Sequence, residues 1–259
     1  MVLYPIALGR VARDVPAMTT SPLIRDIGLS GMLVTFADRL SEPANRAALA
    51  FRAAVDQAGW DGVHETATSL ASAFIRFDPL ELDHDALKDR LQEMLSGRDW
   101  LAEPLPEGRT LWTIPVALGG DSGPQFDEAA DAAGLSPDAA TEDIAAARTR
   151  VLTIGFAPGQ AYLGELPEHW NIPRLRDLSP NVPQGALVAA IRQLIVFART
   201  TPTGWRHIGQ TAFQSFRPGT DTPFPLTPGD EIRFEPTTPD AIARLADGDG
   251  IGATSEPIA

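Results

Sequence analysis

The chain has 259 residues, of which 44% are hydrophobic and 21% charged, the composition of a soluble globular protein. Its 34 acidic side chains outnumber the 21 basic ones, and the net charge of −13 argues against binding to nucleic acid or to an anionic membrane. Cysteine is absent and Lys88 is the only lysine, which excludes disulfides, thiolate nucleophiles and cysteine-held metals and leaves almost no place for a P-loop or Schiff-base lysine. The sequence shows neither a signal-peptide pattern nor an apolar run long enough to span a bilayer, so we expect a cytoplasmic location.

The first part of the chain reads as a small α+β unit. Residues 1–20 lack periodicity and predict a loose leader. Ser41 followed by Pro43 predicts the capped start of a helix that Gly59 ends. The apolar patterns predict strands at 31–36, 63–68 and 72–77 and a second, amphipathic helix at 83–95. This order of elements is typical of a ferredoxin-like layer, so we expect a ferredoxin-like α+β domain, with its leader, over residues 1–100.

The second part is richer in short strands. Two prolines and a glycine at 104–108 predict a hinge between domains. Beyond it we expect helices at 124–134 and 137–148, and strands at 112–116, 151–154, 186–190, 194–198, 207–208 and 231–234. Closely spaced short strands with turns between them favour a barrel or a sandwich. We therefore predict a β-barrel domain over 108–240 and a mobile tail over 241–259.

Two blocks of sequence stand out, Gly155–Gly164 and Pro202–Thr211. Three glycines and a proline stop a helix or a plain strand from running through the first block. Aromatic and apolar residues lie between these breakers, which indicates a shaped loop with a packed, partly exposed wall. Taken singly, either block also fits an ordinary turn of a β-rich domain.

Together the two blocks resemble the family of the bacterial 5-oxoprolinase B subunit, also known as allophanate hydrolase subunit 1 and as the sporulation-kinase inhibitor. The similarity runs over residues 24–236. Its matching points, in chain order, are Asn45, Ser72, Phe77–Pro79, Gly134–Leu135, Pro137, Gly155–Gly159, Tyr162–Leu163, Leu166–Pro167, Pro173–Arg174, Val182–Pro183, Gly185, Gln193, Pro202, Gly204–Trp205, Ile208–Gly209 and Thr211.

The resemblance implies an α+β fold in which a ferredoxin-like domain precedes a cyclophilin-like β-barrel. It also implies a hydrolase complex in which subunits of three types, A, B and C, together open 5-oxoproline to glutamate at the expense of ATP. This chain would act as the B-type member beside a sister C-type subunit (of the allophanate hydrolase subunit 2 kind) and an A-type subunit, binding no cofactor of its own. Two other functions stay open: a binding module that inhibits a histidine kinase, and the carboxyltransferase part of a biotin-dependent urea carboxylase. A related amidohydrolase or allophanate hydrolase complex is also compatible.

Several positions depart from the pattern of the resembled family. They are Ala145 in place of a histidine, Gln160 in place of a phenylalanine, and Leu178, Ser179, Asn181, Ala186, Phe197, Ala198 and Thr203. Loss of arginines removes side chains that can bind a carboxylate or a phosphate through two hydrogen bonds, and loss of a histidine removes a proton-transfer group. The chain therefore reads as a divergent member of the family.

The candidate site residues belong to the two blocks and the segment between them. Arg174 is suited to hold an anion or to form a surface ion pair, and Tyr162 and Trp205 are suited to wall a pocket or to pack in the core. The predicted substrate-binding set is Gly155, Phe156, Pro158, Gly159, Tyr162, Arg174, Gln193, Pro202, Gly204 and Trp205. No catalytic residue stands out, and the four histidines show no metal-ligand spacing, so no metal site is predicted.

Overall fold

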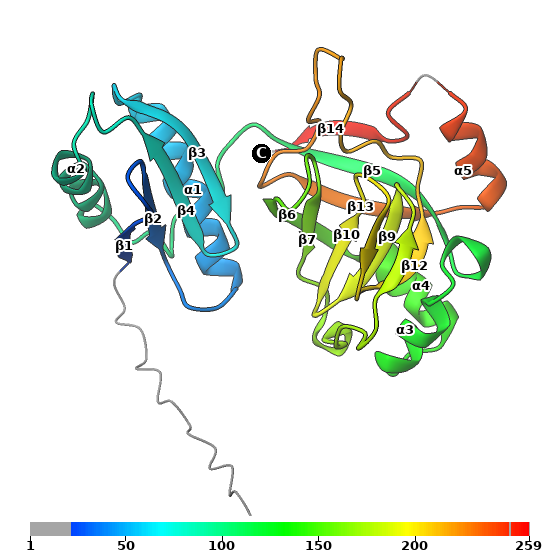
Figure 1. Cartoon of the computed structure of the whole chain (residues 1–259). Helices are drawn as coiled ribbons and strands as arrows, with labels where there is room; N and C mark the ends of the chain where they lie inside the picture. The colour runs from blue at the N-terminus through cyan, green and yellow to red at the C-terminus, as the bar shows by residue number, and fades with distance from the viewer. Residues whose placement is uncertain (1–21, 249, 259) are drawn as a thin grey trace, which may run out of the picture.

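The computed structural model describes residues 22–248 and 250–258 (Figure 1). The leader expected at 1–20 lies outside the described residues. Two large apolar clusters organise the described part, one drawn from residues 32–100 and the other from residues 112–234. The segment 104–108 lies between them in the sequence, and the division into two domains at this segment stays a prediction. No described helix is long and apolar enough to cross a membrane.

The N-terminal unit is an antiparallel sheet with two helices. Its elements are β1 (Leu23–Asp26), β2 (Gly31–Thr35), α1 (Glu42–Ala58), β3 (Val63–Ser69), β4 (Ser72–Phe77) and α2 (His84–Ser96). The strands lie in the order β1-β2-β4-β3. Strand β1 was not expected: it forms a hairpin with β2 and takes the edge of the sheet. The description of this unit as ferredoxin-like stays a prediction.

Local signals fix the helices of this unit. The Ser41 hydroxyl accepts a hydrogen bond from the Ala44 amide at 3.4 Å, and Gly59 ends α1 in the left-handed conformation with φ of 57°. Asp83 caps α2 in the same way as Ser41 caps α1. Both helices contribute to the first apolar cluster, Phe51 from α1 and Leu87 from α2 among them.

The C-terminal unit is a closed barrel. Its strands are β5 (Arg109–Leu118), β6 (Arg148–Ile154), β7 (Ala161–Gly164), β9 (Ala186–Ala190), β10 (Gln193–Val196), β12 (Arg206–Gln210) and β13 (Glu231–Pro236). They follow the order β12-β9-β10-β7-β6-β13-β5, and pairing of β12 with β5 closes the ring. The expected α+β fold with a barrel is confirmed to this extent.

Shorter elements surround the barrel (Figure 1). They are η1 (Gly120–Ser122), α3 (Phe126–Ala132), α4 (Pro137–Ala146), η2 (Glu168–Trp170), the paired strands β8 (Ser179–Val182) and β11 (Thr201–Thr203), α5 (Pro239–Ala246) and β14 (Thr254–Ile258). Helix α3 packs against β12 and helix α4 against β13. The helices expected at 124–134 and 137–148 thus exist, with slightly shorter bounds.

Alternation along β9 and β10 separates two apolar layers. Leu187 and Leu194 belong to the large cluster that fills the barrel, whereas Val188 and Ile195 belong to a smaller cluster on the opposite face. Successive side chains of a strand point to opposite faces of the sheet, so the smaller cluster lies outside the barrel. Tyr162 of β7 packs against this outer layer.

The tail expected to be mobile instead contains ordered elements. Strand β14 pairs antiparallel with β5, from Thr254 opposite Thr113 to Ile258 opposite Arg109. Strand β12 pairs with β5 only at Ala117 and Leu118. The remaining edge of β5 would therefore have unpaired amides and carbonyls, and β14 satisfies them.

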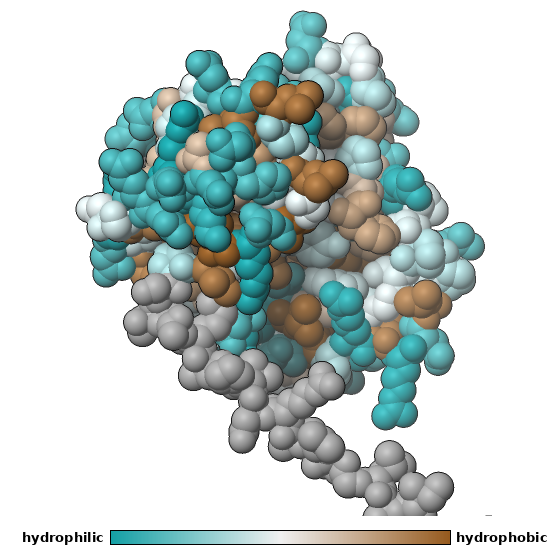
Figure 2. Space-filling view, turned by 60° about the vertical axis from the view of Figure 1, so that its left-hand side comes forward, coloured by the Kyte–Doolittle hydropathy of each residue, from teal (hydrophilic) through white to brown (hydrophobic). Residues whose placement is uncertain are grey.

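Side chains also join the two units. The Asn45 Nδ2 atom donates to the Leu70 carbonyl at 2.7 Å and to the Leu152 carbonyl of β6 at 3.0 Å. The Thr153 hydroxyl donates to the Thr68 carbonyl at 2.7 Å. Asn45 is fully buried; its bond to Leu152 ties α1 to the barrel, and its bond to Leu70 ties α1 to the turn between β3 and β4. The surface in Figure 2 is mainly hydrophilic, with apolar residues in small groups, as the composition suggests.

Candidate functional site

A cavity of about 310 Å³ lies over the outer apolar layer of the barrel. We call it the outer-face pocket; its lining residues are Phe156, Gln160, Tyr162, Arg174, Leu175, Leu178, Ile195, Phe197, Thr201, Pro202, Thr203, Gly204 and Trp205. They come from the loop before β7, from β7, from β10 and the residue after it, and from the segments 174–178 and 201–205. The two distinctive blocks of the sequence thus meet at one place.

The loop before β7 is tightly turned. The Gly155 amide donates to the Gln160 carbonyl at 3.1 Å, and the Ala157 amide donates to the Gly155 carbonyl at 2.8 Å. The second bond closes a three-residue turn centred on Phe156, whose φ of 67° is unusual for a residue with a side chain. The Phe156 side chain is 79% exposed and lines the pocket. The unusual backbone and the exposed aromatic ring at a cavity make Phe156 a candidate binding residue.

Aromatic rings and one cation form a wall of the outer-face pocket. Trp205 is buried, and its ring meets that of Tyr162 edge to face with centroids 6.2 Å apart. The Arg174 guanidinium carbon lies 5.2 Å from the centroid of the Trp205 ring, a cation–π distance. Within the described part of the chain Arg174 forms no ion pair, so its charge remains available to an anionic ligand.

A buried arginine holds the segment that carries Arg174. The Nε atom of Arg206 lies 3.0 Å from a carboxylate oxygen of Glu128, and its Nη1 atom donates to the Pro173 carbonyl. The Leu175 amide donates to the Gly204 carbonyl at 2.7 Å. Arg174 is therefore fixed on both sides, by a side chain before it and by a backbone bond after it.

Gln160 is the most enclosed polar residue of the pocket lining. Its side chain is 2% exposed, and its Oε1 atom has no hydrogen-bond partner among the described residues. A buried amide oxygen without a partner costs about 1–3 kcal/mol. The position is one at which the sequence departs from the resembled pattern.

The structure unites only some of the predicted site residues. Phe156, Tyr162, Arg174, Pro202, Gly204 and Trp205 line the outer-face pocket. Gly155, Pro158, Gly159 and Gln193 do not line it. Gly159 is needed for close packing, since a Cβ there would lie 2.2 Å from the Ser215 carbonyl oxygen. Gln193 pairs with Gly164 and Ala190 in the barrel wall.

Sequence reasoning missed several contributors to the pocket. Leu175, Leu178, Thr201 and Phe197 line it, and Arg206 and Glu128 position it. One signal was present: Arg206 stands in a strand between Trp205 and His207, where a charged side chain needs a partner. The partner itself comes from α3, which local sequence does not reveal.

Two ionisable groups outside the pocket have shifted pKa values. Burial disfavours the charged form of His207 and lowers its pKa, although its ring contact with the Gly209 carbonyl opposes this. Burial alone would raise the pKa of Asp143, but hydrogen bonds from His169 and Trp170 outweigh it and the pKa is lowered. The Trp170 indole Nε1 atom donates a hydrogen bond to the Asp143 carboxylate at 2.7 Å, and this bond links η2 to α4.

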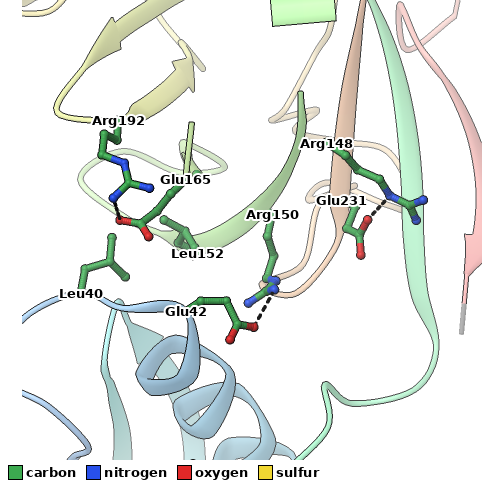
Figure 3. A pocket seen from close by; sticks show the side chains of 9 residues that line it. Leu40, Glu42, Arg148, Arg150, Leu152, Glu165, Arg192 and Glu231 are labelled. Carbon is green, nitrogen blue, oxygen red and sulfur yellow. Dashed lines mark hydrogen bonds and ion pairs between the residues drawn. The ribbon is translucent and has the colours of Figure 1, made fainter. Parts of the chain in front are cut away.

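A second cavity, of about 360 Å³, lies between α1 and the barrel. Figure 3 shows its charged side chains in opposed pairs. The pairs are Arg150 with Glu42, Arg148 with Glu231, and Arg192 with Glu165. Because each arginine already faces a carboxylate, this cavity is largely neutralised, and it offers less to an anion than Arg174 does.

Three possible metal ligands lie together in the N-terminal unit, where none was expected. One ligand atom each of His64, Asp78 and Glu81 falls within 4.8 Å of the others. Asp78 already accepts a hydrogen bond from the Leu80 amide at 2.9 Å, and His64 and Glu81 are exposed. This group lies in the sheet unit and contributes nothing to the outer-face pocket.

Comparison with known proteins places this geometry in a family. The family model described as carboxyltransferase domain, subdomain C and D, matches residues 22–226. The chain belongs to this carboxyltransferase-domain family. It is 29% identical over 227 residues to the 5-oxoprolinase B subunit of Bacillus subtilis (strain 168), covering 84% of this chain and 93% of that protein. It is 37% identical over 159 residues to the 5-oxoprolinase B subunit of Escherichia coli O157:H7, covering 61% of this chain and 71% of that one.

Solved structures agree with the family assignment. The crystal structure of TTHA0988 matches with a TM-score of 0.68 and 29% identity over 84% of this chain. The chain spans only 41% of TTHA0988, so that relative is more than twice as long. The Kluyveromyces lactis urea carboxylase matches with a TM-score of 0.71 over 94% of this chain, but its 16% identity supports a shared fold alone.

Proposed function

We propose that this carboxyltransferase-domain protein is the B-type subunit of an ATP-dependent 5-oxoprolinase that cleaves 5-oxoproline to glutamate in the cytoplasm. The observation that carries the proposal is the convergence of the motif residues Phe156, Arg174 and Trp205 on one small cavity. Two similar proteins bear the name of the 5-oxoprolinase B subunit, which supports the choice of reaction. A compact pocket with aromatic walls and an arginine suits a small carboxylate.

The pocket lining suits binding better than proton transfer. Its members include no histidine, aspartate, glutamate or lysine within the described residues. Acid–base groups and the ATP site would therefore come from partners, a sister C-type subunit and an A-type subunit. The names of the relatives, which designate one subunit among several, are consistent with such a complex.

Reconstitution tests this function. The full chain is combined with A- and C-type subunits from the same organism, and glutamate formation from 5-oxoproline is followed with and without ATP. We expect ATP-dependent cleavage that disappears when this chain is omitted. Equal activity without this chain would overturn the proposal, as would capture of a histidine kinase by this chain in place of any effect on cleavage. An adjacent biotin carboxylase gene would instead favour urea carboxylation.

A further inference from the structure

The cavity of about 360 Å³ between α1 and the barrel, which we call the junction cavity, shares no lining residue with the outer-face pocket within the described part of the chain. Its charged lining consists of three arginines and three glutamates, namely Arg148, Arg150, Arg192, Glu42, Glu165 and Glu231. Ligand sites occur preferentially where two units meet, and they combine apolar surface with a few placed polar groups. The distribution of these charges over the cavity therefore indicates the kind of ligand that fits it.

One side of the junction cavity is rich in cations. Arg148 and Arg150 come from the same face of β6, since successive side chains of a strand alternate between faces. The Glu42 Oε1 atom lies 3.1 Å from Arg150 Nη2 and 3.4 Å from Arg46 Nε, so one carboxylate is divided between two guanidinium groups. Glu231 likewise contacts two arginines, Arg148 among them. Because these carboxylates are shared, the two arginines of β6 keep the capacity to bind an anion.

The other side of the junction cavity is rich in carboxylates. The Arg192 Nη1 atom lies 3.1 Å from Glu168 Oε2 and 3.7 Å from Glu165 Oε1, so one guanidinium serves two carboxylates. The closer partner, Glu168, does not line the cavity, whereas Glu165 lines it and its side chain is 25% exposed. Glu165 is therefore accessible and loosely paired. A cation that binds it leaves Arg192 with Glu168 as its partner.

The turn that carries Arg192 has an unusual backbone. Ile191 and Arg192 connect β9 to β10 with φ of 47° and 62°, in a left-handed conformation that glycine adopts more readily. A β-branched residue such as Ile191 is rare in this conformation. The Arg192 Nε atom donates to the Leu166 carbonyl at 2.9 Å, which fixes the guanidinium beside the cavity. Residues in such conformations cluster at functional sites, which supports a binding role for this end of the cavity.

Leu152 separates the two sides of the junction cavity. Figure 3 shows its side chain between the Arg192–Glu165 pair and the Arg150–Glu42 pair. A ligand that satisfies both sides carries a cation and an anion at separate ends, joined by an apolar chain. We propose that the junction cavity binds a short ω-amino acid, with its ammonium group on Glu165 and its carboxylate on Arg150. Such a ligand has no net charge, which matches a lining of equal numbers of arginines and glutamates.

Four probes test the proposal on the full chain by calorimetry. They are 4-aminobutyrate, butyrate, which lacks the ammonium group, butylamine, which lacks the carboxylate, and glycine, whose two charged groups share one carbon. We expect 4-aminobutyrate to bind at least about tenfold more tightly than butyrate or butylamine, because each of these loses a hydrogen bond to a charged group. Glycine should also bind more weakly, since it is too short to reach both sides. A probe of these three that binds as tightly as 4-aminobutyrate would overturn the proposal.

Two substitutions each remove one end of the site. Glu165→Gln should weaken binding of 4-aminobutyrate by about tenfold and leave butyrate unchanged, because only the ammonium group loses its partner. Arg150→Met should weaken 4-aminobutyrate and butyrate and leave butylamine unchanged. Glu65→Gln is the matched control and should change nothing. Glu65 pairs with Arg76 at 2.9 Å on the N-terminal sheet and does not line the junction cavity.

A further variant separates this site from the outer-face pocket. Arg174→Met should leave binding of 4-aminobutyrate unchanged, because Arg174 lines the other pocket. Loss of binding in Arg174→Met would place the ligand in the outer-face pocket and overturn the proposal, as would unchanged binding in both Glu165→Gln and Arg150→Met. If Arg150→Met fails to fold, Glu165→Gln and the four probes decide the matter. The result is independent of whether a complex with this chain cleaves 5-oxoproline.

Discussion

The Nη1 atom of Arg206 donates a hydrogen bond to the Pro173 carbonyl oxygen at 2.5 Å. Arg206 is 7% exposed and lies in strand β12, whereas Pro173 lies in the irregular segment 171–178 that carries Arg174. The bond therefore holds Arg174, the residue after Pro173, in a fixed position relative to the barrel. Glu128 of α3 balances the charge of the buried guanidinium.

Replacement of Arg206 by methionine should lower both stability and ligand binding. The variant loses hydrogen bonds to a carboxylate and a carbonyl, so the free energy of unfolding should fall by about 1.5–3 kcal/mol in urea denaturation. Affinity for 5-oxoproline should fall as well, since Arg174 loses its support. Arg76→Met is the control: its ion pair with Glu65 is about half exposed on both sides and contributes at most about 1 kcal/mol. Unchanged affinity in folded Arg206→Met would show that Arg174 is positioned otherwise.

Two glycines of one loop should respond differently to alanine. At Gly159 a Cβ would lie 2.2 Å from the Ser215 carbonyl oxygen, and φ is +72°. Gly159→Ala should therefore destabilise the protein by more than about 1 kcal/mol. At Gly155 a Cβ would meet nothing within 4 Å, so Gly155→Ala should leave the melting temperature nearly unchanged. A comparable loss of stability in both variants would contradict this account of the loop.

Burial of His207 should make stability depend on pH. Its folded pKa lies below the ordinary value of 6.5, so below pH 6.5 the unfolded chain binds a proton more readily than the folded one. Stability contributed by neutral His207 is thus present above pH 6.5 and is lost as pH falls toward the folded pKa. In His207→Gln, the midpoint of denaturation should depend less on pH over this window. His64→Gln, at an exposed histidine of β3, is the control.

Asn45→Ala should loosen the junction between the two units. The variant loses donors to the Leu70 and Leu152 carbonyls in a fully buried place, at a cost of about 1–3 kcal/mol. Hydrogen exchange should increase at α1 and β6 together, because the bond to Leu152 joins these two elements. Asn171→Ala, at an exposed site with a weak contact to Glu168, is the control. Faster exchange in α1 alone would limit the role of Asn45 to its own helix.

Local chemistry explains why much of the fold was predictable. The start and end of α1 depend on Ser41, Pro43 and Gly59, all readable in the sequence. Strand β7 was hidden within the glycine-rich block, because Ala161–Gly164 is too short to show a period. Strand β14 was also missed, since Thr254–Ile258 includes Pro257 and gains its order only from the open edge of β5. Pairings between distant segments leave no local mark.

The candidate site was predictable only in its motif residues. Phe156, Arg174 and Trp205 stood in or between distinctive blocks, and the structure brings them to one cavity. Gln160 appeared only as a departure from a pattern, because its missing hydrogen-bond partner is a property of three-dimensional packing. Gly155 and Gly159 share a motif with these residues, and the structure gives them different environments, one open and one crowded.

The separation of the barrel interior from the outer-face pocket bears on how this family diverges. Leu187 and Leu194 hold the interior together, whereas Leu178 and Thr203 lie over the opposite face. A mutation on the outer face leaves the interior packing intact, so selection for a new ligand does not have to be accompanied by repair of the fold. Gln160, Leu178 and Thr203, all departures from the resembled pattern, line the outer-face pocket. Substitutions at such positions change the lining of the pocket while the packing of the barrel interior stays the same.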